Sequence, residues 1–155
     1  MGEEIQIIAA FPGLQADPDF KITSPCNPDY NCIAWAYHYD DRWMWPGGVE
    51  QKIADGFHYW PDDVDDTADV AAFISAFEKK GFSVCDNDDF EPGYRKIALY
   101  VKKGTTECTH AARQLNNGKW TSKLGRLYDI QHGTPYTIEG DSYGKVFCIM
   151  KVEHK

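Results

Sequence analysis

Residues 108–124 read CTHAARQLNNGKWTSKL, and the predicted fold of this chain depends on this stretch. Segments 108–115 and 119–124 have the composition of β-strands. Between them, Asn116-Asn117-Gly118 contains the Asn-Gly pair that is typical of tight hairpin turns, because both residues tolerate a positive φ. The stretch therefore predicts an antiparallel hairpin.

Strands are also predicted on both sides of this hairpin. Three more segments have strand-like patterns: GFSVC (81–85), YRKIALYVKK (94–103) and GKVFCIMKVEH (144–154). A further short strand is expected at EIQII (4–8), in a first segment that several prolines punctuate. The second half of the chain is therefore expected to form an antiparallel sheet.

Two helices are expected before that sheet. The clearest is 67–80, where apolar residues at i, i+3, i+4 and i+7 form one stripe and Gly81 suits the position after the last turn. The other runs from Cys32 to about Tyr39 and is apolar on all sides, which is typical of a buried helix. Helices followed by strands indicate an α+β fold, and we expect one domain over residues 1–155.

Composition excludes several classes of protein. The formal charge of −8 argues against nonspecific nucleic-acid binding, which needs a basic surface. No apolar run is long enough for a membrane span, and the first residues lack a Sec signal peptide, so we expect a cytoplasmic protein or one exported by another route. Five cysteines without a CxxC pair favour neither a disulfide framework nor a zinc site, so no metal or cofactor is expected.

The stretch DYNCIAWAYHYDDRWMWP (29–46) places Cys32 at the expected start of the buried helix. A helix N-terminus and a nearby imidazolium both lower the pKa of a thiol, which is how a cysteine becomes a nucleophile. Of the five histidines, His110 is the best partner, because it opens a strand beside the small residues Ala111 and Ala112. His132 follows YDIQ and is assigned to a loop. We therefore expect Cys32 and His110 to form a catalytic pair.

The third catalytic residue would hold the imidazole in one tautomer, and two candidates remain. If residues 116–118 form the hairpin loop, residue 112 pairs with Ser122, and Ser122 lies on the face of His110. If the loop is shorter by one residue, Ser122 faces away. Asp129 is favoured slightly, because a carboxylate stabilises an imidazolium.

Two motifs resemble those of a known family. YNCIAWA is similar to the cysteine-bearing helix start of papain-like cysteine peptidases, and THAARQLNNGKWTSKLG is similar to their histidine strand and the hairpin that follows. The likeness is greatest to the compact bacterial branch, which includes cell-wall amidopeptidases and toxins delivered into competing cells. It covers residues 26–40 and 94–152. It implies a central helix carrying Cys32, packed on an antiparallel sheet of about four to five strands.

The resemblance also implies a function. Cys32 would attack a peptide or isopeptide bond of a protein or peptide substrate, and His110 would transfer the proton. The oxyanion would bind the Cys32 N–H and Asn31 or Asn27, where the family often has a glutamine. A toxin of this kind would have an immunity protein as partner.

Two alternatives to the hydrolase remain. The first is an inactive papain-like binding module in which Cys32 is simply buried. The second is a deamidase or acyltransferase that uses the same pair, because a fold does not fix a reaction.

Overall fold

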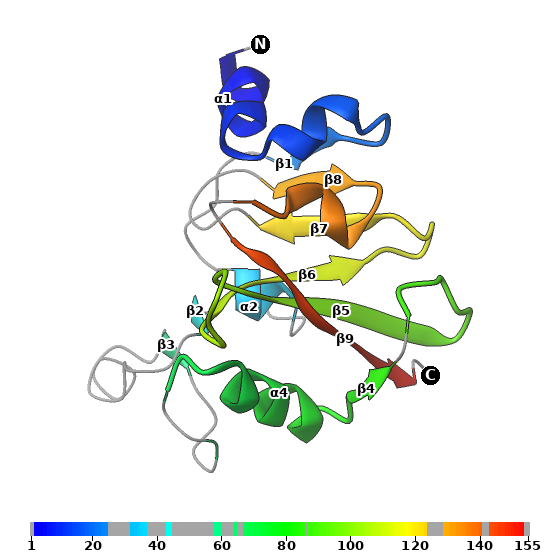
Figure 1. Ribbon diagram of the computed structural model, residues 1–155. Coiled ribbons are helices and arrows are strands. Elements are labelled where there is room, and N and C mark those ends of the chain that lie inside the picture. Colours follow the sequence, from blue (N-terminus) through cyan, green and yellow to red (C-terminus); the bar gives the residue numbers. More distant parts are fainter. Residues whose placement is uncertain are drawn as a thin grey trace.

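The structure is a computed structural model that describes residues 2–24, 32–36, 43–44, 58–59, 64, 67–85, 87–123, 129–140 and 143–153. These residues form a seven-stranded antiparallel sheet in the order β1-β8-β7-β6-β5-β9-β4, and a parallel two-stranded ladder, β2-β3 (Figure 1). The strands are β1 (Lys21–Ser24), β2 (Trp43–Met44), β3 (His58–Tyr59), β4 (Ser83–Cys85), β5 (Tyr94–Val101), β6 (Cys108–Gln114), β7 (Trp120–Lys123), β8 (Asp129–His132) and β9 (Lys145–Glu153). The helices are α1 (Gly2–Ala10), α2 (Cys32–Ala36) and α4 (Val70–Lys79), with 3-10 turns η1 (Pro12–Ala16) and η2 (Pro135–Ile138).

The papain-like α+β layout predicted from the sequence is wrong. The main sheet has seven strands instead of the expected four to five, and it dominates the described part of the chain. The longest of the described helices is α4, with 10 residues, whereas the helix that carries Cys32 is described over only 5. In the described part of the chain, the sheet and not this helix is therefore the central element. The sheet is wider than expected because β1 and β8, which the sequence did not predict, extend it beyond the hairpin.

The hairpin of β6 and β7 has the longer of the two predicted loops. Arg113 lies opposite Thr121 and Gln114 lies opposite Trp120, which makes residue 112 level with Ser122. The Leu115 N–H donates to the Lys119 carbonyl at 2.7 Å and closes the loop. This register puts Ser122 on the same side of the sheet as His110.

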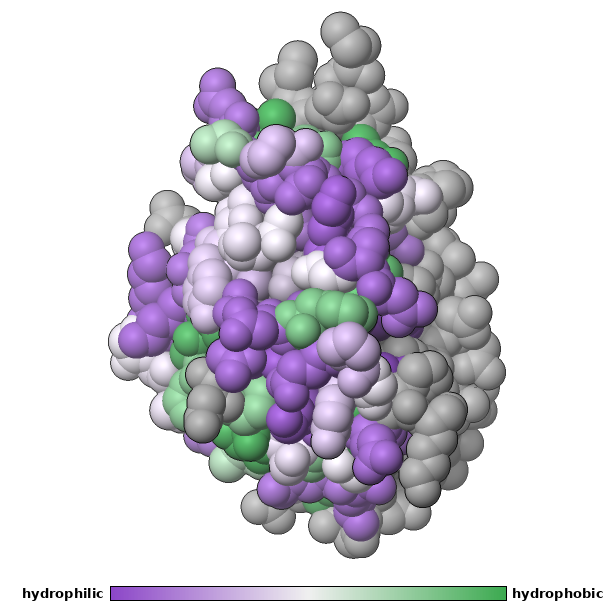
Figure 2. All heavy atoms as spheres, turned by 90° about the vertical axis from the view of Figure 1, so that its right-hand side faces the viewer, coloured by the Kyte–Doolittle hydropathy of each residue, from purple (hydrophilic) through white to green (hydrophobic). Residues whose placement is uncertain are grey.

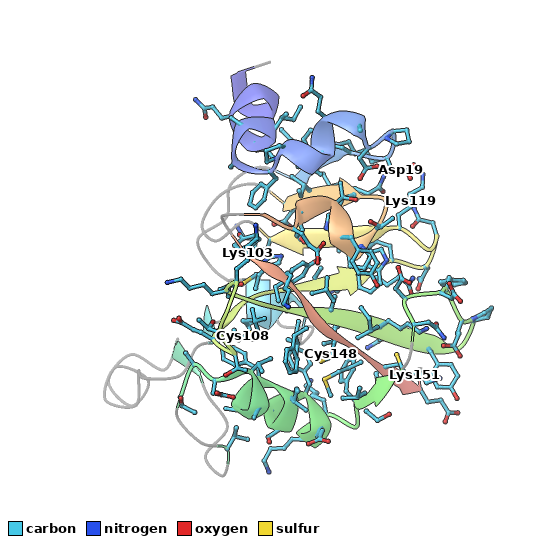
Figure 3. The ribbon with its side chains drawn as sticks, viewed as in Figure 1. Asp19, Lys103, Cys108, Lys119, Cys148 and Lys151 are labelled. Carbon is cyan, nitrogen blue, oxygen red and sulfur yellow. The ribbon has the colours of Figure 1, made fainter. Side chains whose placement is uncertain are left out.

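Each face of the sheet has its own apolar cluster. On one face, α2 and α4 pack on alternate residues of β5 and β6, and Ile97, Leu99 and Ala111 are fully buried there. Cys108 and Cys148 also belong to this face, between the sheet and α4 (Figure 3). On the other face, α1, η1 and η2 cover a second cluster that contains Ala98, Tyr100, Ala112, Trp120 and Ile130.

Helix α4 confirms the predicted helix within a few residues. Its stripe buries Val70, Phe73 and Phe77 against the sheet. Asp69 caps the first turn, because its Oδ1 accepts the Ala71 N–H at 2.9 Å.

The first segment is helical, so the strand expected at residues 4–8 is wrong. Ile7, Phe11 and Leu14 recur at spacings of four and three residues and are all buried in the second cluster. This helical spacing extends from α1 into η1, and it outweighs the strand preference of the β-branched isoleucines.

Both neighbours of β5 contain an extra residue at the level of Tyr100. In β6, Tyr100 lies opposite His110 while Val101 lies opposite Cys108, so Thr109 is the inserted residue. In β9, Leu99 lies opposite Cys148 and Tyr100 lies opposite Val146, so Phe147 is inserted. Such bulges bend a strand and redirect its side chains. His110 therefore follows directly after a bulge.

The coloured part of the face shown in Figure 2 is mainly hydrophilic. In Figure 2, apolar residues form small separate groups on the face shown, between larger hydrophilic areas. Among the described residues, no helix is both long and apolar enough to span a membrane.

Candidate functional site

Cys32 is the first residue of α2 and is only 7% exposed. It packs in the same apolar cluster as Ala111. Burial raises the pKa of its thiol to about 11, while hydrogen bonding from the Ala111 N–H and the charge of Lys123 lower it. Cys32 is therefore a neutral thiol at neutral pH. Its sulfur lies beside the β6 backbone at Ala111, the residue that follows His110.

The position of Cys32 coincides with a gap in the sheet. Among the described residues, the register of β6 with β7 is given at Arg113 and Gln114, and it does not extend to Ala111. Helix α2 packs against both strands. The Ala111 N–H therefore hydrogen-bonds to the Cys32 sulfur in the part of β6 where β7 is not paired with it.

His110 is fully buried between aromatic rings. The ring of Tyr143 stacks on it at 4.0 Å between centroids with an interplanar angle of 4°, and Tyr100 lies at 5.2 Å. The Thr109 hydroxyl donates to the Tyr143 carbonyl and fixes the stacking residue. Burial raises the pKa of Tyr143, and the charge that Cys32 carries when it is ionised raises it further.

A chain of hydrogen bonds leads away from His110. Its Nε2 lies 3.0 Å from Ser122 Oγ, which lies 2.8 Å from His132 Nε2. The Nδ1 of His132 lies 2.8 Å from the carbonyl oxygen of Thr134. His110, Ser122 and His132 are each 0% exposed, and we call these three residues the histidine–serine chain.

Both histidines of this chain are neutral at pH 7. Burial lowers the pKa of His110 well below its usual value, and the charge of His132 lowers it further. Burial also lowers the pKa of His132 to about 4, against opposing effects of the Thr134 carbonyl and Asp17. The network therefore carries no net charge.

The other ring nitrogen of His110, Nδ1, has different surroundings from Nε2. His110 Nδ1 is buried and has no hydrogen-bond partner among the described residues, so it makes no hydrogen bond to the Cys32 thiol. Cys32 lies with the apolar cluster of α2 and α4, and His110 projects toward Ser122 on the other side of the sheet. The two side chains therefore lie on opposite sides of β6, and no hydrogen bond joins them.

Asp129 lies on the opposite face from His110. It pairs with Lys123 across β7 and β8, with 3.9 Å between Asp129 Oδ1 and Lys123 Nζ. We call these two residues the buried ion pair, because their side chains are 5% and 0% exposed. The structure therefore brings Ser122 to His110 and does not bring Asp129 there.

The remaining predicted site residues lie outside the described part of the chain. Asn31 and Asn27, the candidates for binding an oxyanion, are both in that category. Within the described ranges, no cluster of three or more His, Cys, Asp or Glu side chains could hold a metal ion.

Sequence reasoning missed His132, which it assigned to a loop. His132 is the last residue of β8 and lies opposite Trp120, two residues from Ile130, which lies opposite Ser122. The alternation of DIQH as a strand was the available signal, because Ile130 and His132 then share one face.

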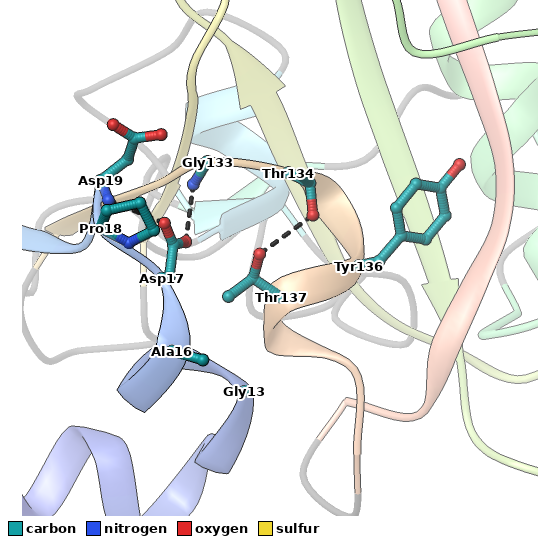
Figure 4. A pocket seen from close by; sticks show the side chains of 9 residues that line it. All are labelled: Gly13, Ala16, Asp17, Pro18, Asp19, Gly133, Thr134, Tyr136 and Thr137. Carbon is teal, nitrogen blue, oxygen red and sulfur yellow. Dashed lines mark hydrogen bonds between the residues drawn. The ribbon is translucent and has the colours of Figure 1, made fainter.

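A surface pocket of about 400 Å³ lies beside the end of the chain of hydrogen bonds. It is lined by Gly13, Ala16, Asp17, Pro18, Asp19, Gly133, Thr134, Tyr136 and Thr137 (Figure 4). Asp17 Oδ2 accepts the Gly133 N–H at 2.7 Å, and Asp19 forms an ion pair with Lys119 at 3.0 Å (Figure 3). The carboxylates at this pocket are thus engaged with the hairpin and with the segment that follows β8.

Comparison with known proteins gives one match. A family model described as a domain of unknown function, DUF7689, matches residues 21–151. No curated protein and no solved structure matches the chain. The matched region includes Cys32 and the whole histidine–serine chain, whereas α1 and η1 precede it.

Proposed function

The chain belongs to the DUF7689 family, and we propose that this member is a thiol-dependent hydrolase that cleaves peptide or isopeptide bonds. Cys32 is the nucleophile and His110 is the general base. The proposal concerns the reaction and the two side chains, and it does not depend on a papain-like fold, because similar catalytic groups occur on unrelated folds.

One observation carries the proposal. His110 is fully buried and held by Ser122 at Nε2, yet its Nδ1 has no partner among the described residues. Buried polar atoms without partners are rare and costly in native proteins, and catalytic groups are one recognised reason for them. The free nitrogen belongs to the residue that precedes Ala111, whose N–H hydrogen-bonds to the Cys32 sulfur.

In the proposed reaction, the Cys32 thiol and the His110 imidazole are both neutral before the attack. As the Cys32 sulfur attacks the substrate carbonyl, His110 Nδ1 takes the thiol proton and a C–S bond forms. His110 then returns this proton to the leaving amine as the C–N bond breaks, which leaves a thioester. Water hydrolyses the thioester, with His110 again acting as base. Because burial disfavours the thiolate, the proton moves during the attack instead of beforehand.

A second candidate is a non-catalytic binding module. It is favoured by the 7% exposure of Cys32, by its raised thiol pKa, and by the lack of a hydrogen bond between this thiol and His110. Cys32 would then be a core residue that packs between α2 and β6.

Substrate cleavage tests the first candidate directly. A proteome or a peptidoglycan preparation is incubated with the protein, and new amino termini are mapped by mass spectrometry. We expect cleavage by the wild type and none by Cys32→Ala, with Cys148→Ala as the control that retains it. His110→Ala should reduce the rate by about 10²–10⁴-fold, the usual contribution of a general base. Side-chain amides converted to acids without new termini would indicate a deamidase instead.

Thiol reactivity separates the two candidates without a known substrate. Cys148 is the matched control, because burial raises its pKa to about 11 as well, although it is less buried than Cys32. Accessibility alone predicts faster alkylation of Cys148 by iodoacetamide at neutral pH. Assistance by His110 predicts faster alkylation of Cys32, and His110→Ala should abolish that advantage. If Cys32 reacts only after unfolding, the protein is the binding module.

A further inference from the structure

The donor and acceptor roles in the histidine–serine chain can be assigned from its far end. The Thr134 carbonyl oxygen can only accept a hydrogen bond, so His132 Nδ1, at 2.8 Å, must carry a proton. His132 is neutral, because burial lowers its pKa to about 4. A neutral imidazole has a single N–H, so His132 Nε2 is an acceptor.

The remaining roles follow in order. Ser122 lies 2.8 Å from His132 Nε2 and has one hydroxyl proton, so its O–H donates to this nitrogen. Ser122 Oγ can then only accept from His110 Nε2, at 3.0 Å. His110 Nε2 therefore carries the ring proton, and Nδ1, which has no partner among the described residues, holds a lone pair.

We propose that His132 is a positioning residue that fixes the tautomer of His110 through Ser122 and so keeps Nδ1 free as the base. This proposal rests on the proposed function for its catalytic meaning, although the tautomer can be measured without any activity. Without an acceptor at position 132, the Ser122 hydroxyl could turn and donate to His110 Nε2. His110 would then carry its proton on Nδ1 and could not take one from Cys32.

The backbone around Thr134 is held so that its carbonyl stays in place. The N–H of the preceding residue, Gly133, donates to Asp17 Oδ2 at 2.7 Å, and the hydroxyls of Thr134 and Thr137 lie 3.0 Å apart (Figure 4). A Cβ on Gly133 would lie 2.9 Å from Asp19 Oδ2 and 3.0 Å from Asp17 Oδ1, so a larger residue there would disturb this arrangement. The Thr134 carbonyl oxygen accepts the hydrogen bond that fixes the tautomer. It is held in place through Asp17, which directly follows η1, and Thr137 of η2.

No proton passes along the histidine–serine chain in the reaction. When His110 Nδ1 takes the thiol proton, the Nε2 proton remains on His110 and continues to donate to Ser122 Oγ. The chain acts by orienting the ring and fixing its tautomer, as a carboxylate or amide does in other triads. It does so with neutral groups only.

Nuclear magnetic resonance of the wild-type protein tests the proposal. Long-range ¹⁵N–¹H correlations of imidazole rings report which nitrogen carries the proton. At neutral pH we expect an Nε2–H tautomer for His110 and an Nδ1–H tautomer for His132. An Nδ1–H tautomer at His110 in the folded wild type would overturn the proposal.

Two variants of His132 sharpen the test. In His132→Gln the amide oxygen can still accept from Ser122, so the His110 tautomer should persist. In His132→Leu the acceptor is lost, and His110 should shift toward Nδ1–H. Thermal unfolding establishes that each variant is folded; if neither folds, the wild-type spectrum still decides. An unchanged His110 tautomer in folded His132→Leu would show that His132 does not set it.

Kinetics separate this proposal from the proposed function. With a substrate, kcat of His132→Leu should fall by up to roughly 10⁴-fold, as expected for a wrong tautomer, whereas KM changes little and His132→Gln recovers most of the rate. If no hydrolysis is found but the tautomers are as expected, the proposed function fails and the positioning role of His132 stands. If hydrolysis is found with the other tautomer, the positioning role fails alone.

Discussion

Strands β7 and β8 carry two buried polar groups of opposite character on their two faces. Ser122 and His132 face α1, η1 and η2 and belong to the neutral histidine–serine chain. Lys123 and Asp129 face α2 and form the buried ion pair. Each member of one group is close in sequence to a member of the other, so the pleat of the sheet alone separates them.

The difference shows that register decides which polar residue reaches a histidine, whatever its chemical suitability. Asp129 is the better partner for an imidazolium, but the alternation of β7 and β8 places it on the wrong face. Ser122 is the weaker partner by charge, yet it lies 3.0 Å from His110 Nε2. A neutral His110 needs orientation more than charge, and a serine supported by His132 provides it.

Breaking the buried ion pair should have the largest effect on stability. Asp129→Ala removes the carboxylate that faces the buried Lys123 ammonium, and breaking a buried ion pair costs about 3–5 kcal/mol. Urea unfolding should detect the loss, while the rate per folded molecule stays close to that of the wild type. Replacing both residues with Met and Leu should restore most of the stability. A large fall in the rate of folded Asp129→Ala would show that Asp129 takes part in catalysis.

Breaking the histidine–serine chain should reduce stability less, and activity more, than breaking the buried ion pair. Ser122→Ala leaves two buried ring nitrogens without their partner, which costs about 1–3 kcal/mol. The rate per folded molecule should fall more than in Asp129→Ala, because His110 loses its orientation. Equal rates for the two variants would contradict the assignment of Ser122 to the site.

Acid should destabilise the protein through the same chain. The folded pKa of His132 is about 4 and its unfolded value is 6.5, so between these values the unfolded state binds a proton that the folded state does not. The free energy of unfolding should therefore fall as pH decreases from about 6.5, by up to about 1.4 kcal/mol per pH unit for each such histidine. His110 adds to the same effect, because its pKa is also lowered.

A comparison of wild type and His132→Gln isolates the contribution of His132. The variant lacks one of the two titrating groups, so its unfolding free energy should fall less steeply in this pH range. Identical pH dependence would show that His132 is protonated equally in the folded and unfolded states.

The smallest effect is expected far from both polar groups. Asp69→Ala removes the cap of α4 and should cost about 1 kcal/mol. The rate per folded molecule should stay unchanged, which makes this variant the reference for loss of stability alone. A fall in rate would mean that α4 affects the site, and the rates of the other variants would need correction for it.

The sequence predicted local elements better than their assembly. The stripe of α4, the strands β5, β6, β7 and β9, and the Asn-Gly turn all have strong short-range signals. The strands β1 and β8 have only 4 residues each, and the alternation of DIQH in β8 is too short to stand out, so the width of the sheet was missed. Their place depends on long-range pairing, which local patterns do not encode.

The candidate site was predictable only in part. Cys32 and His110 have recognisable neighbours in the sequence, and the register that brings Ser122 to His110 was one of two open alternatives. His132 could not be assigned without knowing that DIQH is a strand paired with β7. The choice of Asp129 followed from charge, and it assumed an imidazolium where burial keeps His110 neutral.

The inserted residue of β6 beside Tyr100 lets a core residue and a site residue lie two positions apart on opposite faces of the sheet. Thr109 shifts the alternation of β6 by one residue, so Cys108 can face the cluster of α4 while His110 faces Ser122. Deleting Thr109 would make Cys108 and His110 adjacent, and adjacent residues of a regular strand face opposite sides, so each side chain would keep its face. The deletion would instead remove the bend of the bulge and the hydroxyl that donates to the Tyr143 carbonyl. The inserted residue thus determines the bend of β6 and the support of Tyr143, whereas the faces of Cys108 and His110 follow from their partners in β5.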